Sequence, residues 1–177
     1  MQYRELNASE IYAGTFHCFD RYQEVTQCWR KVNGEWVIRD IAYIESWNEA
    51  DFEALAARLR RTVETSGVVI GAFTDGLLKG FASVEGHRFG SNSEYLDLTN
   101  VHVSCDARGA GIGKELLHLA AVWARAHGAK KLYISAHSSV ESQAFYKAMG
   151  CIEAAEYDPE HVANEPCDCQ MEYDLTQ

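Results

Sequence analysis

A run of glycines between an expected strand and an expected helix is the feature that most constrains the fold. The strand is expected at residues 95–103, and one face of the following helix carries Leu116, Leu117, Ala120 and Trp123. Between them lies Arg108-Gly109-Ala110-Gly111-Ile112-Gly113. A helix N-terminus leaves backbone N–H groups unpaired and carries a partial positive charge. Because glycines let an anion approach those groups closely, the segment predicts a phosphate-binding loop.

The spacing of the glycines separates three kinds of phosphate-binding loop. A nucleotide P-loop requires Gly, four residues, then Gly-Lys-Ser/Thr, but Glu115 stands at the Ser/Thr position. A dinucleotide fingerprint requires a third glycine three residues after the second. That position holds Lys114 or Leu116, depending on which glycines are counted. The remaining pattern is Arg/Gln-x-x-Gly-x-Gly/Ala, which is matched by Arg108, Gly111 and Gly113.

With this pattern the chain resembles the GNAT superfamily of acetyl-CoA-dependent N-acetyltransferases, and a second block of sequence supports the resemblance. Residues 131–136 are typical of a strand, and residues 139–149 of a helix containing Phe145-Tyr146, followed by Gly150-Cys151-Ile152. The resemblance covers residues 68–157 and weakens over the first third of the chain. It implies an α/β (α+β) GNAT fold, in which helices flank a central mixed, mostly antiparallel twisted sheet, with an inserted hairpin near residues 28–39.

Length and composition favour one compact unit. A chain of 177 residues that is 47% hydrophobic can bury one good core. We therefore expect a single domain over residues 1–177, with a variable acceptor-side segment at about 7–47 and a coenzyme-binding core at about 68–157. No stretch approaches the roughly 20 apolar residues of a membrane span, and the first residues lack the pattern of a signal peptide. These features predict a soluble, cytoplasmic protein.

Charge and cysteine usage limit the partners. The formal net charge is −10, which argues against nucleic acid, because such binding depends on Lys and Arg that neutralise phosphates. An acidic surface instead favours cationic acceptors such as amines. The six cysteines show no spacing typical of a small secreted scaffold. Cys167 and Cys169 flank Asp168 on an expected strand, where neighbouring side chains point to opposite faces, so the three would not converge and no metal site is expected.

Turn and cap signals place the other elements. Asn33-Gly34 predicts a hairpin within residues 24–39. Asn48 caps an expected helix that stops near Gly67, and Asp75-Gly76 joins strands at 68–73 and 78–85. Ser138 and Glu141 indicate a capping box for helix 139–149. Short strands are expected at residues 3–6, 152–156 and 169–175.

The resemblance implies a reaction and a set of coenzyme contacts. The acetyl group of acetyl-CoA would pass to a primary amine of a small molecule or peptide by direct attack in a ternary complex, without a metal. The alternative is a non-catalytic acyl-CoA-binding or sensing module on the same fold. Backbone amides of the loop would hold the pyrophosphate, and the strand before it would contact pantetheine and the acetyl group. Ser139 replaces the Asn that many members use for a coenzyme contact. The implied coenzyme-binding residues are Val101, His102, Val103, Arg108, Gly109, Ala110, Gly111, Ile112, Gly113, Lys114, Ser139 and Tyr146.

Four residues are candidates for proton transfer. Tyr146 would donate a hydrogen bond or proton to the departing thiolate, while its neighbour Phe145 faces the core with Val140, Ala144 and Met149. A half-buried structural tyrosine is the alternative reading. Asp97 is the preferred general base, on a strand face shared with Thr99, Val101 and Val103 if no bulge intervenes. Glu85 and His102 are the other candidates, and Asp97 could instead be solvated or salt-bridged.

The acceptor is not identified by any motif. The variable segment and the late strands would shape its pocket, which suits a small-molecule amine with apolar and cationic parts. Alternatively, the aromatic residues bury the hairpin, and Arg21, Arg30 and Arg39 also allow an acceptor with a carboxylate. His137 either orients a substrate or coenzyme or is a polar residue at a strand end, and the remaining histidines, His161 included, have no assigned role. Exposed strands near the end make a homodimer conceivable. The candidate pocket residues are Tyr22, Trp29, Arg30, Trp36, Tyr43, Glu156, Tyr157 and Asp158.

Overall fold

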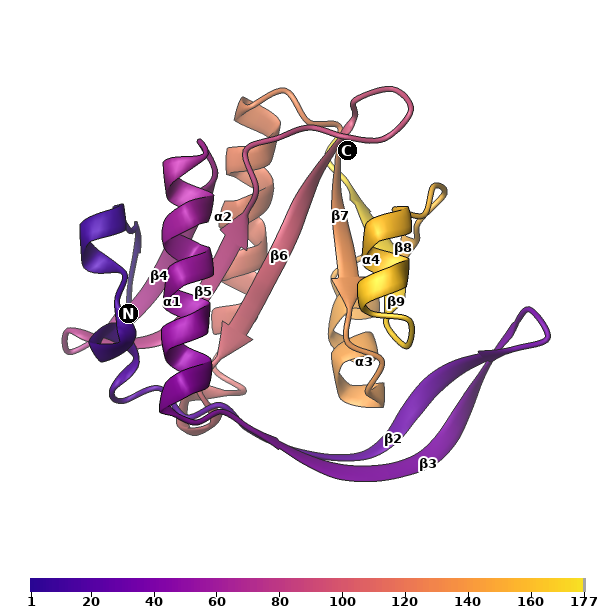
Figure 1. Cartoon of the computed structure of the whole chain (residues 1–177), viewed down its shortest axis with the longest axis horizontal. Coiled ribbons are helices and arrows are strands. Elements are labelled where there is room, and N and C mark those ends of the chain that lie inside the picture. The colour runs from indigo at the N-terminus through magenta and orange to yellow at the C-terminus, as the bar shows by residue number, and fades with distance from the viewer. Residues whose placement is uncertain (177) are drawn as a thin grey trace.

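The computed structural model describes residues 1–176, and within them a seven-stranded sheet forms the centre of the molecule (Figure 1). Its strand order is β1-β4-β5-β6-β7-β9-β8. Only β6 and β7 pair in parallel, and every other pair is antiparallel. The mixed, mostly antiparallel sheet is as predicted. The strands are β1 (Gln2–Glu5), β4 (Val68–Thr74), β5 (Leu77–Val84), β6 (Tyr95–Val103), β7 (Lys131–Ala136), β8 (Ile152–Glu153) and β9 (Cys169–Asp174).

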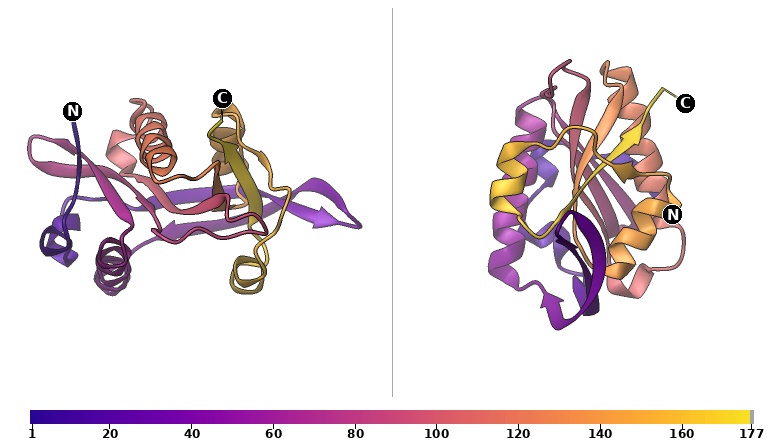
Figure 2. Two further views of the ribbon diagram at one scale, coloured as in Figure 1. Left: turned by 90° about the horizontal axis from the view of Figure 1, so that it is seen from above. Right: turned by 90° about the vertical axis from the view of Figure 1, so that its right-hand side faces the viewer.

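Helices cover both faces of this sheet. Figure 2 shows α1 (Glu49–Glu64) and α4 (Pro159–Asn164) on one face, with α2 (Ile112–Ala126) and α3 (Val140–Ala148) on the other. Short 3-10 turns lie at Ala8–Glu10, Ala13–Phe16 and Cys105–Ala107. The α2 side holds the larger cluster of buried residues, and α2 approaches β5 closely. A Cβ built on Gly80 would lie 2.7 Å from Ile112 Cγ2, so glycine is required there.

The cap that begins α1 is as predicted. Asn48 Oδ1 accepts hydrogen bonds from the backbone N–H groups of Ala50 at 2.8 Å and Asp51 at 3.2 Å. Leu55 and Leu59 are buried in the cluster that contains Phe81 of β5. The helix stops earlier than expected, because Thr65 rather than Gly67 is its C-cap.

Strands β6 and β7 part along their length, and this separation positions the candidate site. They pair only at Tyr95–Lys131, Leu96–Leu132 and Asp97–Tyr133, although β6 continues to Val103. On its other side β6 stays paired to β5, with a register shift where Val84 faces Leu98 and Ser83 faces Asn100. The unmatched residue is Thr99. A bulge of this kind bends a strand and increases its twist, and β6 diverges from β7 beyond it (Figure 1).

The bulge also inverts the faces of β6. Leu96 and Leu98 are buried in the cluster under α2, and Val101 and Val103 pack against the same cluster. Before the bulge the even-numbered residues of β6 face this cluster, and after it the odd-numbered residues do, because one extra residue moves every later side chain to the other face. The expectation that Asp97 shares a face with Val101 and Val103 is therefore wrong.

The predicted hairpin exists and is longer than expected. β2 (Tyr22–Val32) and β3 (Glu35–Ser46) form a separate two-stranded unit, and Asn33 and Gly34 have φ of 51° and 88°, as the predicted turn requires. Its β2 strand crosses to the start of α3, where the backbone N–H of Trp29 donates to Ser138 O at 2.8 Å. The hairpin therefore spans the divergent ends of β6 and β7.

Three local predictions need correction. Ser139, not Ser138, is the N-cap of α3, since its side chain accepts from the backbone N–H of Ser142, so the proposed capping box with Glu141 is absent. The strand expected at 152–156 shortens to Ile152–Glu153. The helix α4 was not anticipated. In the described part of the chain, no helix is long and apolar enough to cross a membrane.

Candidate active site

Two cavities open where β6 and β7 separate in the described chain. The sheet cavity, about 650 Å³, lies among β6, the hairpin, α1 and α4. The loop cavity, about 580 Å³, lies between the glycine segment and α3. Six residues line both of them, so ligands in the two cavities would meet at a common wall. These residues are Gln23, Val101, Val103, Arg108, Ser142 and Tyr146.

The loop cavity is built around the N-terminus of α2. Gly111 is the N-cap, with φ of 79° and no side-chain cap, and the backbone N–H of Glu115 bonds to Gly111 O at 3.1 Å. Among residues 1–176, the backbone N–H groups of 109–114 have no acceptor. Six of the seven residues predicted from this loop line the cavity, and Ala110 is the exception. Free amides at a helix N-terminus, beside Arg108 and Lys114, form an anion-binding surface.

The free edge of β6 faces the separation. The backbone N–H of Ser104 donates to Lys79 O at 2.9 Å, so Ser104 is directed toward β5. Since N–H groups alternate along a strand, those of Val103 and Val101 are directed to the opposite edge. Arg108 Nε donates to Val103 O at 3.3 Å, which places that edge at the cavities. These two amides are therefore available to a carbonyl oxygen bound in the separation.

His102 lies on the other face of β6 and lines only the sheet cavity. Its ring packs against Trp47, with ring centroids 4.9 Å apart, and against Phe81 at 5.3 Å. Burial, with Arg21 and Arg108 nearby, lowers the pKa of His102 to about 3. A neutral imidazole with such a low pKa is a weak proton acceptor.

Tyr146 stands in the wall between the cavities. Burial raises the pKa of its phenol, and its hydroxyl has no hydrogen-bond partner among residues 1–176. The expected division of α3 is wrong in part. Phe145 lines the loop cavity rather than the core, Ala144 is exposed, and the buried residue of this helix is Gln143. Gln143 Nε2 donates to His137 O at 3.0 Å and so satisfies its amide.

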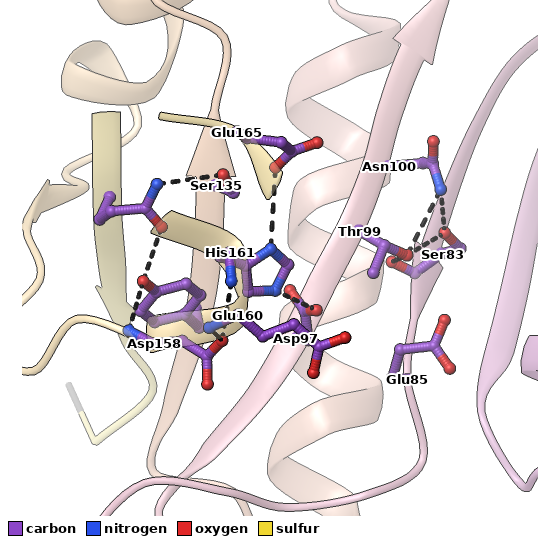
Figure 3. A network of polar contacts seen from close by, with 12 residues as sticks. Ser83, Glu85, Asp97, Thr99, Asn100, Ser135, Asp158, Glu160, His161 and Glu165 are labelled. Atoms are coloured by element: carbon purple, nitrogen blue, oxygen red, sulfur yellow. Dashed lines mark hydrogen bonds and ion pairs between the residues drawn. The ribbon is translucent and has the colours of Figure 1, made fainter. Parts of the chain in front are cut away.

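Asp97 lies in the sheet cavity and pairs with a residue that the sequence did not single out. Asp97 Oδ2 lies 2.7 Å from His161 Nε2 on α4, while Asp97 Oδ1 is buried and has no partner among residues 1–176 (Figure 3). Burial raises the pKa of Asp97, and the hydrogen bond and charge of His161 oppose that rise. The bond to Asp97, followed by the contact to Glu165, raises the pKa of His161 to about 10. The Asp158-Pro159 pair, a helix-start signal, could have revealed α4.

Glu85 reaches the same cavity from the end of β5. Its Oε1 accepts from Thr62 Oγ1 at 2.7 Å, and its backbone N–H donates to Asp97 O at 2.9 Å. Figure 3 shows the carboxyl groups of Glu85 and Asp97 on neighbouring strands, below the linked side chains of Ser83, Thr99 and Asn100. The structure therefore brings Asp97, Glu85 and His102 together around one cavity.

The hairpin contributes a different set of residues from the one expected. Arg21, Gln23, Glu45 and Trp47 line the sheet cavity, and Arg21 Nη2 pairs with Glu45 Oε2 at 2.7 Å. His137 also lines it, with Nε2 2.8 Å from the hydroxyl of Tyr43. None of the expected pocket residues lines either cavity; Trp29 and Trp36 instead border a small one of about 100 Å³. The residues named for the acceptor pocket lie outside both cavities, which favours the alternative that the aromatics bury the hairpin; they are Tyr22, Trp29, Arg30, Trp36, Tyr43, Glu156, Tyr157 and Asp158.

Ser139 is also displaced from its expected place. It is fully buried, its hydroxyl caps α3 and accepts from Gln23 Nε2 at 3.3 Å, and it lines neither cavity. The neighbouring residue that lines both cavities is Ser142. Across residues 1–176, no three His, Cys, Asp or Glu side chains are grouped as metal ligands, and the six cysteines are free thiols.

Comparison with known proteins gives one family and a set of similar folds. The family model described as "Acetyltransferase (GNAT) family" matches residues 20–151. A search of curated protein sequences returns no significant match. The chain is similar to a nourseothricin acetyltransferase structure, at 19% identity and a TM-score of 0.68, over 98% of each chain.

Two further solved structures extend this comparison. One is a Bacillus anthracis strain Ames protein assigned as a streptothricin acetyltransferase, in complex with acetyl coenzyme A, at 16% identity and a TM-score of 0.70 over 97% of this chain and 95% of that one. The other is an aminoglycoside 6'-N-acetyltransferase complexed with coenzyme A, at 14% identity and a TM-score of 0.56 over 71% and 82%. At these identities the likeness concerns the fold.

Proposed function

The chain belongs to the GNAT acetyltransferase family, and from that premise we propose that it transfers the acetyl group of acetyl-CoA to a primary amine of a small polar molecule. The supporting observation is the common wall of the two cavities. Val101, Val103 and Tyr146 line both, so an acyl group carried in one cavity would meet an amine held in the other. We treat residues 1–177 as one such domain, with the hairpin segment on the acceptor side.

The loop cavity would hold the coenzyme. The amides of residues 109–114 would bind the diphosphate, and Arg108 and Lys114 add positive charge beside it. The pantetheine arm would then run along the free edge of β6, where the N–H groups of Val101 and Val103 could bind the thioester carbonyl. Such fixed donors stabilise the negative charge that develops on that oxygen during attack. Similar structures solved with acetyl-CoA or coenzyme A support this placement.

Two proton transfers complete the reaction. As the new C–N bond forms and the C–S bond breaks, the amine loses a proton and the sulfur gains negative charge. Tyr146 would donate its hydroxyl hydrogen to that sulfur, because its phenol stays protonated and has no acceptor among residues 1–176. Asp97 would take the proton of the amine through water, because burial raises its pKa and so its basicity. Glu85 is the second candidate for the base, and His102 is disfavoured by its low pKa.

The sheet cavity favours a polar acceptor that carries more than one functional group. Its wall includes the acidic residues Glu45, Glu85, Asp97 and Glu165 and the basic residues Arg21, Arg58 and Arg108. A simple alkylamine could bond to only one or two of these groups, whereas an acceptor with several polar groups could bond to more of them. Two of the similar structures that cover nearly the whole chain carry the nourseothricin and streptothricin names. We therefore place streptothricin-type and aminoglycoside amines first among acceptors; a cationic acceptor, a homodimer and a cytoplasmic location remain predictions.

An amine panel tests the proposal. Free-thiol release would be followed with acetyl-CoA and streptothricin-type, aminoglycoside, polyamine and amino-acid amines, and mass spectrometry would locate the acetyl group. We expect thiol release that depends on an amine, with one acetyl added at nitrogen. If acetyl-CoA binds but no amine in the panel is acetylated, the acyl-CoA-sensing alternative is favoured instead.

A further inference from the structure

The pair formed by Asp97 and His161 carries an inference that the sequence did not offer. Asp97 lies at the last paired position of β6 and β7, and His161 comes from α4, across the separation between these two strands. The side chains are mostly buried, with exposed fractions of 14% for Asp97 and 25% for His161. A pair in this position controls the charge at one end of the sheet cavity.

The histidine ring is held from several directions. Its Nε2 lies 2.7 Å from Asp97 Oδ2, and its Nδ1 lies 3.7 Å from Glu165 Oε2. The ring also stacks on Tyr133 of β7, with centroids 5.4 Å apart and planes inclined by 26°. Tyr133 is itself fixed, because its hydroxyl donates to Gln170 Oε1 at 2.6 Å. The ring therefore has one well-defined orientation toward the carboxyl group of Asp97.

The charges around the ring favour its protonated form. Asp97 contacts it from β6, Glu165 from the segment after α4, and Asp158 contributes from the N-cap of α4. Tyr133 adds no charge at neutral pH, since burial raises its pKa to about 12. The hydrogen bond to Asp97 and the ion pair with Glu165 raise the pKa of His161 to about 10. An imidazolium is thus present at the carboxylate over the neutral range.

The carboxyl group of Asp97 needs a positively charged partner to stay ionised. Burial raises the pKa of Asp97, and Asp158 and Glu165 raise it further, so an isolated Asp97 would hold a proton more tightly. A protonated carboxyl group cannot accept the proton of an incoming amine. His161 opposes this by bonding to Oδ2 alone, while Oδ1 has no partner within the described structure.

We propose that His161 is a positioning residue for the general base: as an imidazolium, it keeps the Asp97 carboxylate ionised and oriented in the sheet cavity. Glu165 supports it by holding the second ring nitrogen. The proposal rests on the assignment of Asp97 in the proposed function. During turnover the proton of the amine passes to Asp97 through water and then to solvent, and His161 keeps its own proton throughout.

The first test observes the histidine directly and needs no substrate. Imidazole nitrogen NMR of the whole protein would follow His161 from pH 5 to 11, with His161→Gln to identify its signals. We expect an imidazolium that persists to about pH 10, and a lower titration point in both Asp97→Asn and Glu165→Gln, larger in the first. Titration of His161 near 6.5, its ordinary value, would overturn the proposal whatever the enzyme's activity.

The second test uses the pH dependence of kcat/KM for the amine. An opposite charge lowers a carboxyl pKa by about 1–3 units. In His161→Gln the acidic limb of the kcat/KM profile should therefore shift to higher pH by at least about one pH unit, and activity should recover above it. His118→Gln, an exposed histidine on α2 that lines neither cavity, should leave the limb in place. A uniform loss of activity with an unmoved limb would show a merely structural role and overturn the proposal.

The same profiles separate this proposal from the proposed function. If Asp97→Asn abolishes the acidic limb and His161→Gln leaves it unmoved, only the positioning role is refuted. If Asp97→Asn itself keeps the wild-type limb, Asp97 is not the base, and both the assignment and the positioning role fail. If the wild-type protein acetylates no amine, the proposed function fails, and the NMR titration alone decides on the ion pair.

Discussion

The Tyr146→Phe variant isolates the hydroxyl that we place beside the departing sulfur. That hydroxyl has no hydrogen-bond partner among residues 1–176, so its removal leaves no other polar group unpaired. The free energy of unfolding should therefore change by less than about 0.5 kcal/mol. A hydrogen bond to a charged group contributes about 1.5–3 kcal/mol. At about 1.4 kcal/mol per factor of ten, its loss in the transition state should lower kcat by about 10- to 150-fold.

The assay compares turnover with binding. kcat would come from thiol release at saturating acetyl-CoA and amine, and the Kd of acetyl-CoA from calorimetry. We expect that Kd to change by less than about twofold, because the bond forms mainly with the leaving group. Tyr173→Phe is the matched control, since Tyr173 is also partly buried and lines neither cavity. Unchanged kcat in Tyr146→Phe, or an equal fall of kcat in the control, would refute the role of the hydroxyl.

Three further predictions follow from the same geometry. Gly111→Ala should cost about 1–2 kcal/mol in backbone strain at φ of 79°. Calorimetry should show acetyl-CoA binding weakened by at least about tenfold. The control Gly34→Ala, at φ of 88° in the hairpin turn, should cause similar strain and leave the Kd of acetyl-CoA unchanged. Asp97→Asn should remove the acidic limb of kcat/KM; if the limb persists in Asp97→Asn and disappears in Glu85→Gln, the base is Glu85. The pKa of His161 is about 10 in the folded state against 6.5 ordinarily, so its contribution to stability is full below about pH 6.5 and lost as pH rises through about 10. Urea titrations should show this fall in the wild type and little of it in His161→Gln; an equal fall in both would contradict the pairing.

Features set by neighbours in the sequence were predictable. The strand at residues 95–103, the glycine loop and the helix after it follow from local periodicity and from backbone conformations that glycine alone adopts easily. The Asn33-Gly34 turn and the Asn48 cap have similarly local causes. The residues predicted to bind the coenzyme line the loop cavity, apart from His102, Ala110 and Ser139, and their contacts with a coenzyme stay predictions.

Features set by distant contacts were not predictable. The bulge at Thr99 depends on how β6 matches β5, and it decides which side of the sheet Asp97 faces. The hairpin was recognised, but the choice of its inner face depends on docking against the segment between β7 and α3, so Gln23 and Glu45 were missed in favour of aromatic residues. His161 had no signal of its own, because its role arises only when α4 meets β6.

A crystal structure of the protein with coenzyme A tests the central claim most directly. The account predicts diphosphate oxygens within about 3.2 Å of backbone nitrogens in residues 109–114, as hydrogen bonds require, with the coenzyme sulfur beside the Tyr146 hydroxyl. A diphosphate bound away from this helix N-terminus, or a sulfur outside the common wall of the two cavities, would contradict it.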